Sequence, residues 1–234
     1  MLTNFNSPEA KAAASDEEII ALRYSLAEFA AATFSGVGKK LHLAGAIIGG
    51  DRAAGLSPFH NGSDEVGAVG LVLQISGELA GSATELYKSG KCYAASALLR
   101  QVEELEYLSW AFHTRNRDAE RWLRSSGDER RQFFTPAKLR AGAQGSFRSK
   151  DYEFHCELGG HPVPGAIAPL RGDVSVTRLM LSDMIGHLGR IWDHIVGWSA
   201  SSNISEIIQQ PHAEMVRKFM AWKQCDLLAQ LPPP

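Results

Sequence analysis

The sequence lacks the features that mark secreted, disulfide-linked and membrane-spanning proteins. Its 234 residues include three cysteines, an odd number with no Cys-x-x-Cys pair, which argues against a disulfide framework or a thiolate zinc site. The longest largely apolar run, Ala68 to Ile75, is far shorter than the roughly 20 residues that span a bilayer. No basic segment followed by an apolar one stands at the N-terminus. These absences predict a cytoplasmic protein that does not enter a membrane.

Motifs of the common nucleotide-binding and hydrolytic folds are missing as well. The chain has no GxGxxG after a strand and no GxxxxGK[ST], and it contains neither HExxH nor GxSxG. Alternating polar and apolar residues, which predict β-strands, are not found either. Dinucleotide-binding α/β folds, zincins and α/β-hydrolases are therefore disfavoured.

The sequence does contain a hydrophobic period of about 3.6 residues, which predicts α-helices. Ser15 and Glu18 form a capping box for the first helix, and Ser63 caps a helix that ends before Gly90. Further helices are predicted over about 91–113, 117–125, 128–134, 136–141, 147–158, 174–198 and 212–229, with loops at 35–62 and 159–165. Residues 1–14 indicate a disordered lead-in. Residues 15–231 indicate one all-α domain, an antiparallel bundle of about four long helices with its core at about 64–198.

Four glycines interrupt the helix predicted after Ser63, at positions 67, 70, 77 and 81. Each costs about 1 kcal/mol relative to alanine inside a helix, so a compensating gain is expected. We predict that the backbone of a neighbouring helix approaches closely at these positions.

Charge is distributed unevenly along a chain whose formal net charge is -2. From Arg115 to Lys150 there are ten Lys or Arg against four Asp or Glu, and aromatic residues are interleaved among them. Aromatic rings can stack on bases beside arginines that bind phosphate, so this window favours RNA as a partner. Arginines on short solvated helices would produce the same pattern.

Arg100 and Glu104 lie four residues apart on an otherwise apolar helix face, together with Tyr93 and Tyr107. Charged groups on such a face need a partner when they are buried. One interpretation is an intrahelical ion pair that stabilises the bundle. The other is a pocket in which Arg100 binds an anionic group and Glu104 orients it.

A second polar group comprises Arg148, Tyr152, His155 and, beyond the helix, His161. Arg148 and His155 are two helical turns apart and project from one face. A guanidinium can stabilise a phosphorane-like transition state while an imidazole transfers a proton, which allows phosphodiester cleavage without a metal. The spacing alone is also expected by chance in a chain of this composition.

The third polar group, Asp183, His187, Arg190 and His194, follows one face of the helix predicted at 174–198. A solvated polar face explains it, since the opposite face carries an ordinary apolar stripe. A metal site would need additional ligands from facing helices, and the candidates to join are Glu103, His113, His161 and His212. Because no ligand-spaced motif is present, the sequence predicts no metal and no other cofactor.

Three segments together resemble a group of uncharacterised bacterial helical proteins. They are ASALLRQVEELEYL at 95–108, RDAERWL at 117–123 and DYEFHCELGGHP at 151–162. That group is similar in turn to the HEPN superfamily (higher eukaryotes and prokaryotes nucleotide-binding domain). The resemblance covers about residues 64–198.

The resemblance implies a helical bundle that forms a homodimer, with an Arg-x(4–6)-His motif from each protomer lining an RNA-cleaving cleft. Carried over, the catalytic residues would be Arg148 with His155 or His161, supported by Arg100, Glu104 and Tyr152 as substrate-binding residues. The sequence departs from active members in having Ser149 after the arginine. We therefore expect an RNA-binding protein or metal-independent ribonuclease of a toxin–antitoxin or phage-defence system, whose partners are RNA and a protein partner or antitoxin. The alternatives are a non-enzymatic partner-binding module and a bundle enzyme that binds a metal or small ligand.

Overall fold

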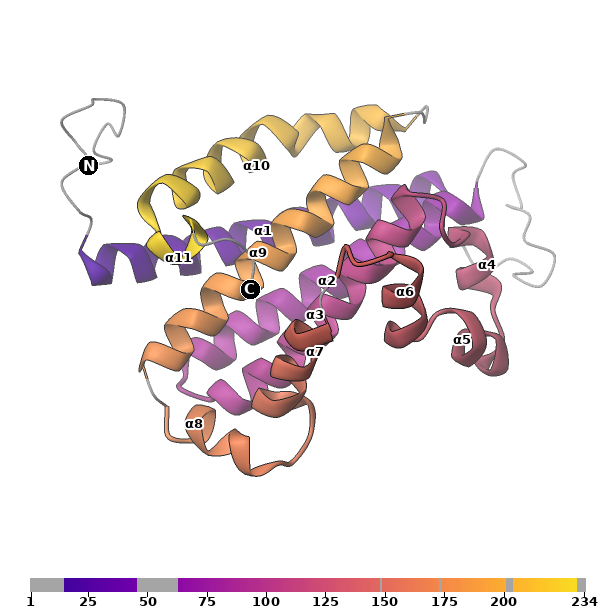
Figure 1. Ribbon diagram of the computed structural model, residues 1–234. Coiled ribbons are helices and arrows are strands. Elements are labelled where there is room, and N and C mark those ends of the chain that lie inside the picture. Colours follow the sequence, from indigo (N-terminus) through magenta and orange to yellow (C-terminus); the bar gives the residue numbers. More distant parts are fainter. Residues whose placement is uncertain (1–14, 46–62, 148, 173, 201–203, 231–234) are drawn as a thin grey trace.

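The computed structural model describes residues 15–45, 63–147, 149–172, 174–200 and 204–230 (Figure 1). Over these residues all regular structure is helical and no strand occurs, so the predicted all-α class is confirmed. Five of the described helices exceed 20 residues: α1 (Asp16–Ala44), α2 (Asp64–Lys88), α3 (Cys92–His113), α9 (Val174–Ser199) and α10 (Ser205–Cys225).

Shorter helices connect α3 to α9 and end the described chain. They are α4 (Ala119–Arg124), α5 (Gly127–Phe133), α6 (Pro136–Gly142), α7 (Ser149–His155), the π-helix η2 (Cys156–Gly160), the 3₁₀ turn η3 (Pro164–Ala166), α8 (Ile167–Leu170) and α11 (Leu227–Gln230). Figure 1 shows α4, α5 and α6 gathered at one end of the long helices, whereas α8 lies at the other end.

The start of α1 agrees with the prediction, and its end does not. The Ser15 side chain accepts a hydrogen bond from the Glu18 backbone, and Glu18 completes the capping box. The loop predicted from residue 35 is wrong for its first part, because α1 continues to Ala44. Phe34, Val37 and Leu41 are buried at helical spacing, so packing maintains the helix across its glycines. The predicted lead-in, residues 1–14, and the rest of the predicted loop, 46–62, lie outside the described residues.

The close contact between α1 and α2 explains two of the four glycines. A Cβ added at Gly70 would lie 2.9 Å from the Gly38 carbonyl oxygen, and one at Gly77 would lie 2.8 Å from the Ala31 carbonyl oxygen. The predicted backbone approach is therefore confirmed at these positions. At Gly81 the nearest atom is 3.8 Å away, so space does not require a glycine there.

Two further predictions are wrong in detail. The loop predicted at 159–165 begins later, since η2 continues through Gly160 and the 3₁₀ turn starts at Pro164. α10 begins at Ser205, so Pro211 lies inside the helix rather than before it. Ile208 is fully buried in the turn before Pro211, and this packing compensates for the backbone hydrogen bond that proline cannot donate.

Helix α3 occupies a central position, because it packs against α2, α9, α6 and the α7–η2 segment. α10 lies across α1 and α9 (Figure 1). By length and composition α2 could cross a membrane, yet 61% of its most apolar window is buried inside the bundle. Its apolar surface is thus used in packing the core.

Candidate functional site

A buried polar cluster lies where α3, α7 and α9 meet. We call it the α3–α7–α9 cluster. Its members are Glu103, Glu106, His155, Asp183, His187 and Arg190. Glu103, Glu106, His155 and His187 are buried, although residues of these types are rarely buried without a compensating partner.

Helical spacing brings the α3 and α9 members together. Glu103 and Glu106 are three residues apart on α3, and Asp183 and His187 are four apart on α9, so each pair shares one helix face. α3 and α9 pack against each other with these polar faces adjoining. The apolar remainder of α9, including Ile185 and Leu188, faces the core.

His155 arrives from a third direction, as the last residue of α7. The π-helix η2 follows at once, and π-helical turns are rare and often found at functional sites. Gly159 in η2 packs directly on α3, because a Cβ there would lie 2.5 Å from the Ala97 backbone nitrogen. This close approach brings the end of α7 onto the polar face of α3.

The contacts of His187 Nδ1 bear on which of the two ring nitrogens carries the lone pair. His187 Nδ1 lies 2.6 Å from Glu106 Oε2, which can only accept, and 2.9 Å from Arg190 Nη2, which can only donate; the shorter contact favours a proton on Nδ1. Arg190 holds Glu106 in place by donating from Nε to Oε1 at 2.8 Å. In a neutral His187 the Nε2 lone pair then points to His155 and Asp183. A histidine whose Nδ1 is held by a carboxylate is the usual arrangement of a metal-binding imidazole.

Three potential ligand atoms converge beside this nitrogen. His187 Nε2 lies 3.4 Å from His155 Nε2 and 3.7 Å from Asp183 Oδ2, and the last two atoms are 3.0 Å apart. The Asp183 oxygen lacks the alignment of a hydrogen bond with either imidazole, despite these short distances. Within the described part of the chain this is the single group of three such ligand atoms that all lie within 4.8 Å of one another.

Two other polar atoms of the cluster are buried and lack a hydrogen-bond partner among the described residues. They are Oε2 of Glu103, whose other oxygen accepts from the Tyr107 hydroxyl, and Nδ1 of His155. Three carboxylates face one guanidinium in the cluster, so with all three ionised it carries two negative charges when the imidazoles are neutral and one when His187 is protonated. Buried charge of this size needs compensation by a cation.

The pKa values reflect the same imbalance. Burial opposes the charge on His187, but Asp183 and Glu106 outweigh it and raise the pKa of His187 to about 9. Burial likewise opposes ionisation of Asp183, yet the two histidines hold its pKa below the ordinary range. The pKa of Glu103 is raised by its burial. The cluster therefore attracts positive charge, either as a proton or as a metal ion.

The residues predicted from sequence as a site are partly brought together. Arg100 donates to Glu104 Oε1 at 2.8 Å and to the Tyr152 hydroxyl at 3.0 Å, so these three form one half-buried group. His155 instead enters the α3–α7–α9 cluster and is 2% exposed, while His161 is exposed. Arg148 lies outside the described residues. RNA cleavage by these side chains stays a prediction from the sequence.

The interpretation of the third polar group as a solvated face is wrong for His187, which is buried against α3 and α7. His194, further along α9, faces His113 with 3.5 Å between their Nδ1 atoms, outside the cluster. Glu106 was not singled out by the sequence. Its three-residue spacing from Glu103 on a largely apolar helix was the available signal.

The basic window is less available to RNA than its composition indicates. Arg115 and Arg124 pair with Glu65 and Asp64 at the start of α2. Most of the other arginines from 117 to 131 bind carboxylates or backbone carbonyls within the window itself. Much of this positive charge is therefore compensated inside the protein.

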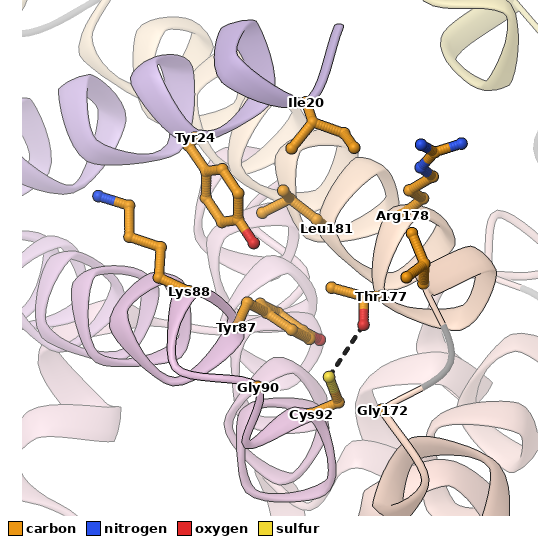
Figure 2. Close-up of a pocket in the computed structure, with 11 residues that line it drawn as sticks. Ile20, Tyr24, Tyr87, Lys88, Gly90, Cys92, Gly172, Thr177, Arg178 and Leu181 are labelled. Carbon is orange, nitrogen blue, oxygen red and sulfur yellow. Dashed lines mark hydrogen bonds between the residues drawn. The ribbon is translucent and has the colours of Figure 1, made fainter. Parts of the chain in front are cut away.

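A shallow pocket of about 250 Å³ opens between α1, the α2–α3 turn and the start of α9 (Figure 2). At its centre the Cys92 thiol lies 2.9 Å from the Thr177 hydroxyl. Lys88 and Arg178 extend away from this contact, and both pair with carboxylates on α1. Because the pocket's cations are already paired, the α3–α7–α9 cluster is the stronger candidate site.

Comparison with known proteins does not assign the chain to a family. No family model, no curated protein and no solved structure matches it. The geometry of the site is therefore the available evidence on function.

Proposed function

We propose that this protein binds a divalent transition-metal ion through His155 Nε2, His187 Nε2 and Asp183 Oδ2. One observation carries the proposal: the three atoms form a triangle with sides of 3.0, 3.4 and 3.7 Å. Bonds of about 2.0–2.1 Å to a tetrahedral zinc ion place neighbouring ligand atoms about 3.3–3.4 Å apart. An ion fits beside this triangle without a large movement of the side chains.

The surrounding residues support the same assignment. The short contact with Glu106 favours a proton on His187 Nδ1, and Arg190 holds Glu106, so the Nε2 lone pair is directed toward His155 Nε2 and Asp183 Oδ2. A dication would also balance the two excess negative charges of the cluster. Imidazole and carboxylate ligands suit zinc and the neighbouring first-row dications better than calcium or magnesium.

A purely structural ion network is the competing explanation. In that arrangement a protonated His187 would lie between Asp183 and Glu106, and His155 would pack beside them as a neutral ring. Both arrangements are compatible with a buried cluster, but they differ in zinc affinity. Only the first requires that zinc binds with one-to-one stoichiometry and that removal of either imidazole abolishes binding.

Calorimetric titration of EDTA-treated, dialysed protein with ZnCl₂ distinguishes the two. The proposal predicts one tight site per chain, which is lost in His187→Ala and Asp183→Asn. His194→Ala is the matched control, since it removes an imidazole from the same helix and from another histidine pair. Absence of tight binding to the wild-type protein, or equal loss in the His194 variant, would rule out the proposed site.

A further inference from the structure

The α7–η2 segment, residues 149–160, has little apolar anchoring on the bundle. Of its described side chains, that of His155 is the only one in the buried class. Tyr152 and Leu158 are half-buried, and Phe154 is 42% exposed. Gly159 allows a close approach to α3 but has no side chain to bury. Tyr152 and Leu158 pack against the core, but a segment with so few fully buried side chains opens at lower free-energy cost than the long helices do.

The one buried side chain of the segment is poorly satisfied by protein groups alone. His155 Nε2 makes one long contact of 3.4 Å with His187 Nε2 and approaches Asp183 Oδ2 at 3.0 Å without hydrogen-bond alignment, and its Nδ1 has no partner in the described chain. Burying a polar ring under these conditions costs free energy. A bond from His155 Nε2 to a metal ion would make burial of this ring favourable, because Asp183 and His187 of α9 would hold the same ion.

The ion's ligands are thus divided between two parts of the molecule. Asp183 and His187 belong to α9, which packs in the core, whereas His155 belongs to the weakly anchored segment. An ion that needs all three ligands binds the docked form and has much lower affinity for the open form. At a free concentration 100 times its Kd, such an ion shifts the docking equilibrium about 100-fold.

We infer that occupancy of this metal site controls the docking of the α7–η2 segment onto α3 and α9. The inference rests on the proposed function and adds a regulatory role to it. Undocking releases Tyr152 from Arg100 and Glu104, and it frees the chain that leads to the exposed His161. Occupancy of the metal site thereby determines which side chains are exposed on this side of α3.

Hydrogen–deuterium exchange of the full-length protein, in EDTA and in ZnCl₂, tests the inference. Zinc is expected to slow amide exchange at least tenfold in peptides that cover 150–160, with little change in the buried part of α2. His187→Ala should make exchange in 150–160 insensitive to zinc, although it leaves the segment's own sequence intact. Tyr152→Phe, which removes the hydroxyl contact with Arg100 but no ligand, should retain the zinc response.

The outcomes separate this inference from the proposed function. If calorimetry shows zinc binding but exchange in 150–160 is unchanged, or slows equally throughout the chain, metal-controlled docking is refuted and the metal site stands. If zinc does not bind the wild-type protein, both are refuted. A zinc response that persists in His187→Ala also overturns the inference, because it assigns the effect to another site.

Discussion

Two buried ionic groups in this protein differ in how completely their polar atoms are paired. In the first, Arg23 of α1 forms a bidentate pair with Asp226, with N–O distances of 2.6 and 2.7 Å. Arg23 Nη1 donates to the Arg178 carbonyl. The Asp226 carboxylate also accepts hydrogen bonds from the Trp222 indole and the Leu228 backbone N–H. In the α3–α7–α9 cluster, by contrast, a Glu103 oxygen and a His155 nitrogen have no partner among the described residues, and two imidazole nitrogens face each other.

The difference separates a structural ion pair from a binding site. A buried pair in which every charged nitrogen and oxygen has a hydrogen-bond partner needs nothing from outside the chain, and it fixes α1 against the C-terminal residues. A cluster with unpaired atoms and excess negative charge is stabilised by a bound positive charge, whether a proton or a metal ion. The following predictions test whether the two groups behave as differently as their geometry implies.

The largest effect is expected from Arg23→Met. This substitution leaves Asp226 buried without its cation and should reduce the free energy of unfolding by about 3–5 kcal/mol. The loss should be the same in zinc and in EDTA, measured by urea denaturation. Arg178→Met, which removes a more exposed pair with Asp16, should cost much less. Similar losses for both variants would contradict the special role of the Arg23 pair.

The second expected effect concerns stabilisation by zinc. At a free zinc concentration 100 times its Kd, the wild-type protein should gain about 2.7 kcal/mol in unfolding free energy relative to EDTA. Asp183→Asn should lose this gain, since it removes one of the three ligands. Arg23→Met should retain it, provided that denaturation begins from the folded state. A zinc-dependent gain in Asp183→Asn would show that the ion binds elsewhere.

Gly159→Ala perturbs the packing of η2 on α3 and, through it, the position of His155 in the α3–α7–α9 cluster. Its added Cβ would clash with the α3 backbone, so we expect a cost of about 1–3 kcal/mol together with weaker zinc binding. Gly81→Ala is the control, because the nearest atom to its Cβ would lie 3.8 Å away, at an ordinary contact distance. Unchanged zinc affinity in Gly159→Ala would mean that this contact does not position His155.

Lowering the pH should weaken the Arg23–Asp226 pair and reduce its contribution to stability. Burial alone would raise the pKa of Asp226, but the hydrogen bonds and charge of Arg23 outweigh it and lower this pKa. A lowered folded-state pKa contributes stability above the unfolded value of about 3.9, and the contribution is lost as pH falls through the folded value. The stability difference between wild type and Asp226→Asn, measured by urea denaturation, should therefore narrow below pH 4. A difference that widens there would contradict this sign.

The smallest effect is expected at the partly exposed pair of Arg100 and Glu104. A double-mutant cycle with Arg100→Met and Glu104→Gln should give a coupling energy of about 0.5 kcal/mol in thermal or urea unfolding. The structure supports coupling, because the two side chains are 2.8 Å apart. Additive losses would mean that each is separately solvated.

Much of the fold was predictable because helices leave local signals. Caps at Ser15 and Ser63 and the stop at Gly90 fixed helix ends that the structure confirms. The continuation of α1 through Gly38 was not predictable, since it depends on the contact with Gly70 of another helix. Local glycine propensity favoured a loop, and tertiary packing overrode it.

The site was less predictable than the fold. Spacing placed Asp183 and His187 on one face of a helix, but spacing cannot tell whether another element covers that face. His155 was selected for a role in RNA cleavage, and its contact with His187 depends on how the chain between them, residues 156–186, brings α9 beside the end of α7. The sequence therefore supplied the ligands individually, and only the tertiary structure brought them together.

Anomalous X-ray diffraction at the zinc absorption edge tests the central claim most directly. Crystals grown with ZnCl₂ should show one strong peak between α3, α7 and α9, about 2.0–2.2 Å from His155 Nε2, His187 Nε2 and Asp183 Oδ2. A peak between His113 and His194, with none in the cluster, would contradict the account. So would crystals at saturating zinc in which the cluster holds no ion.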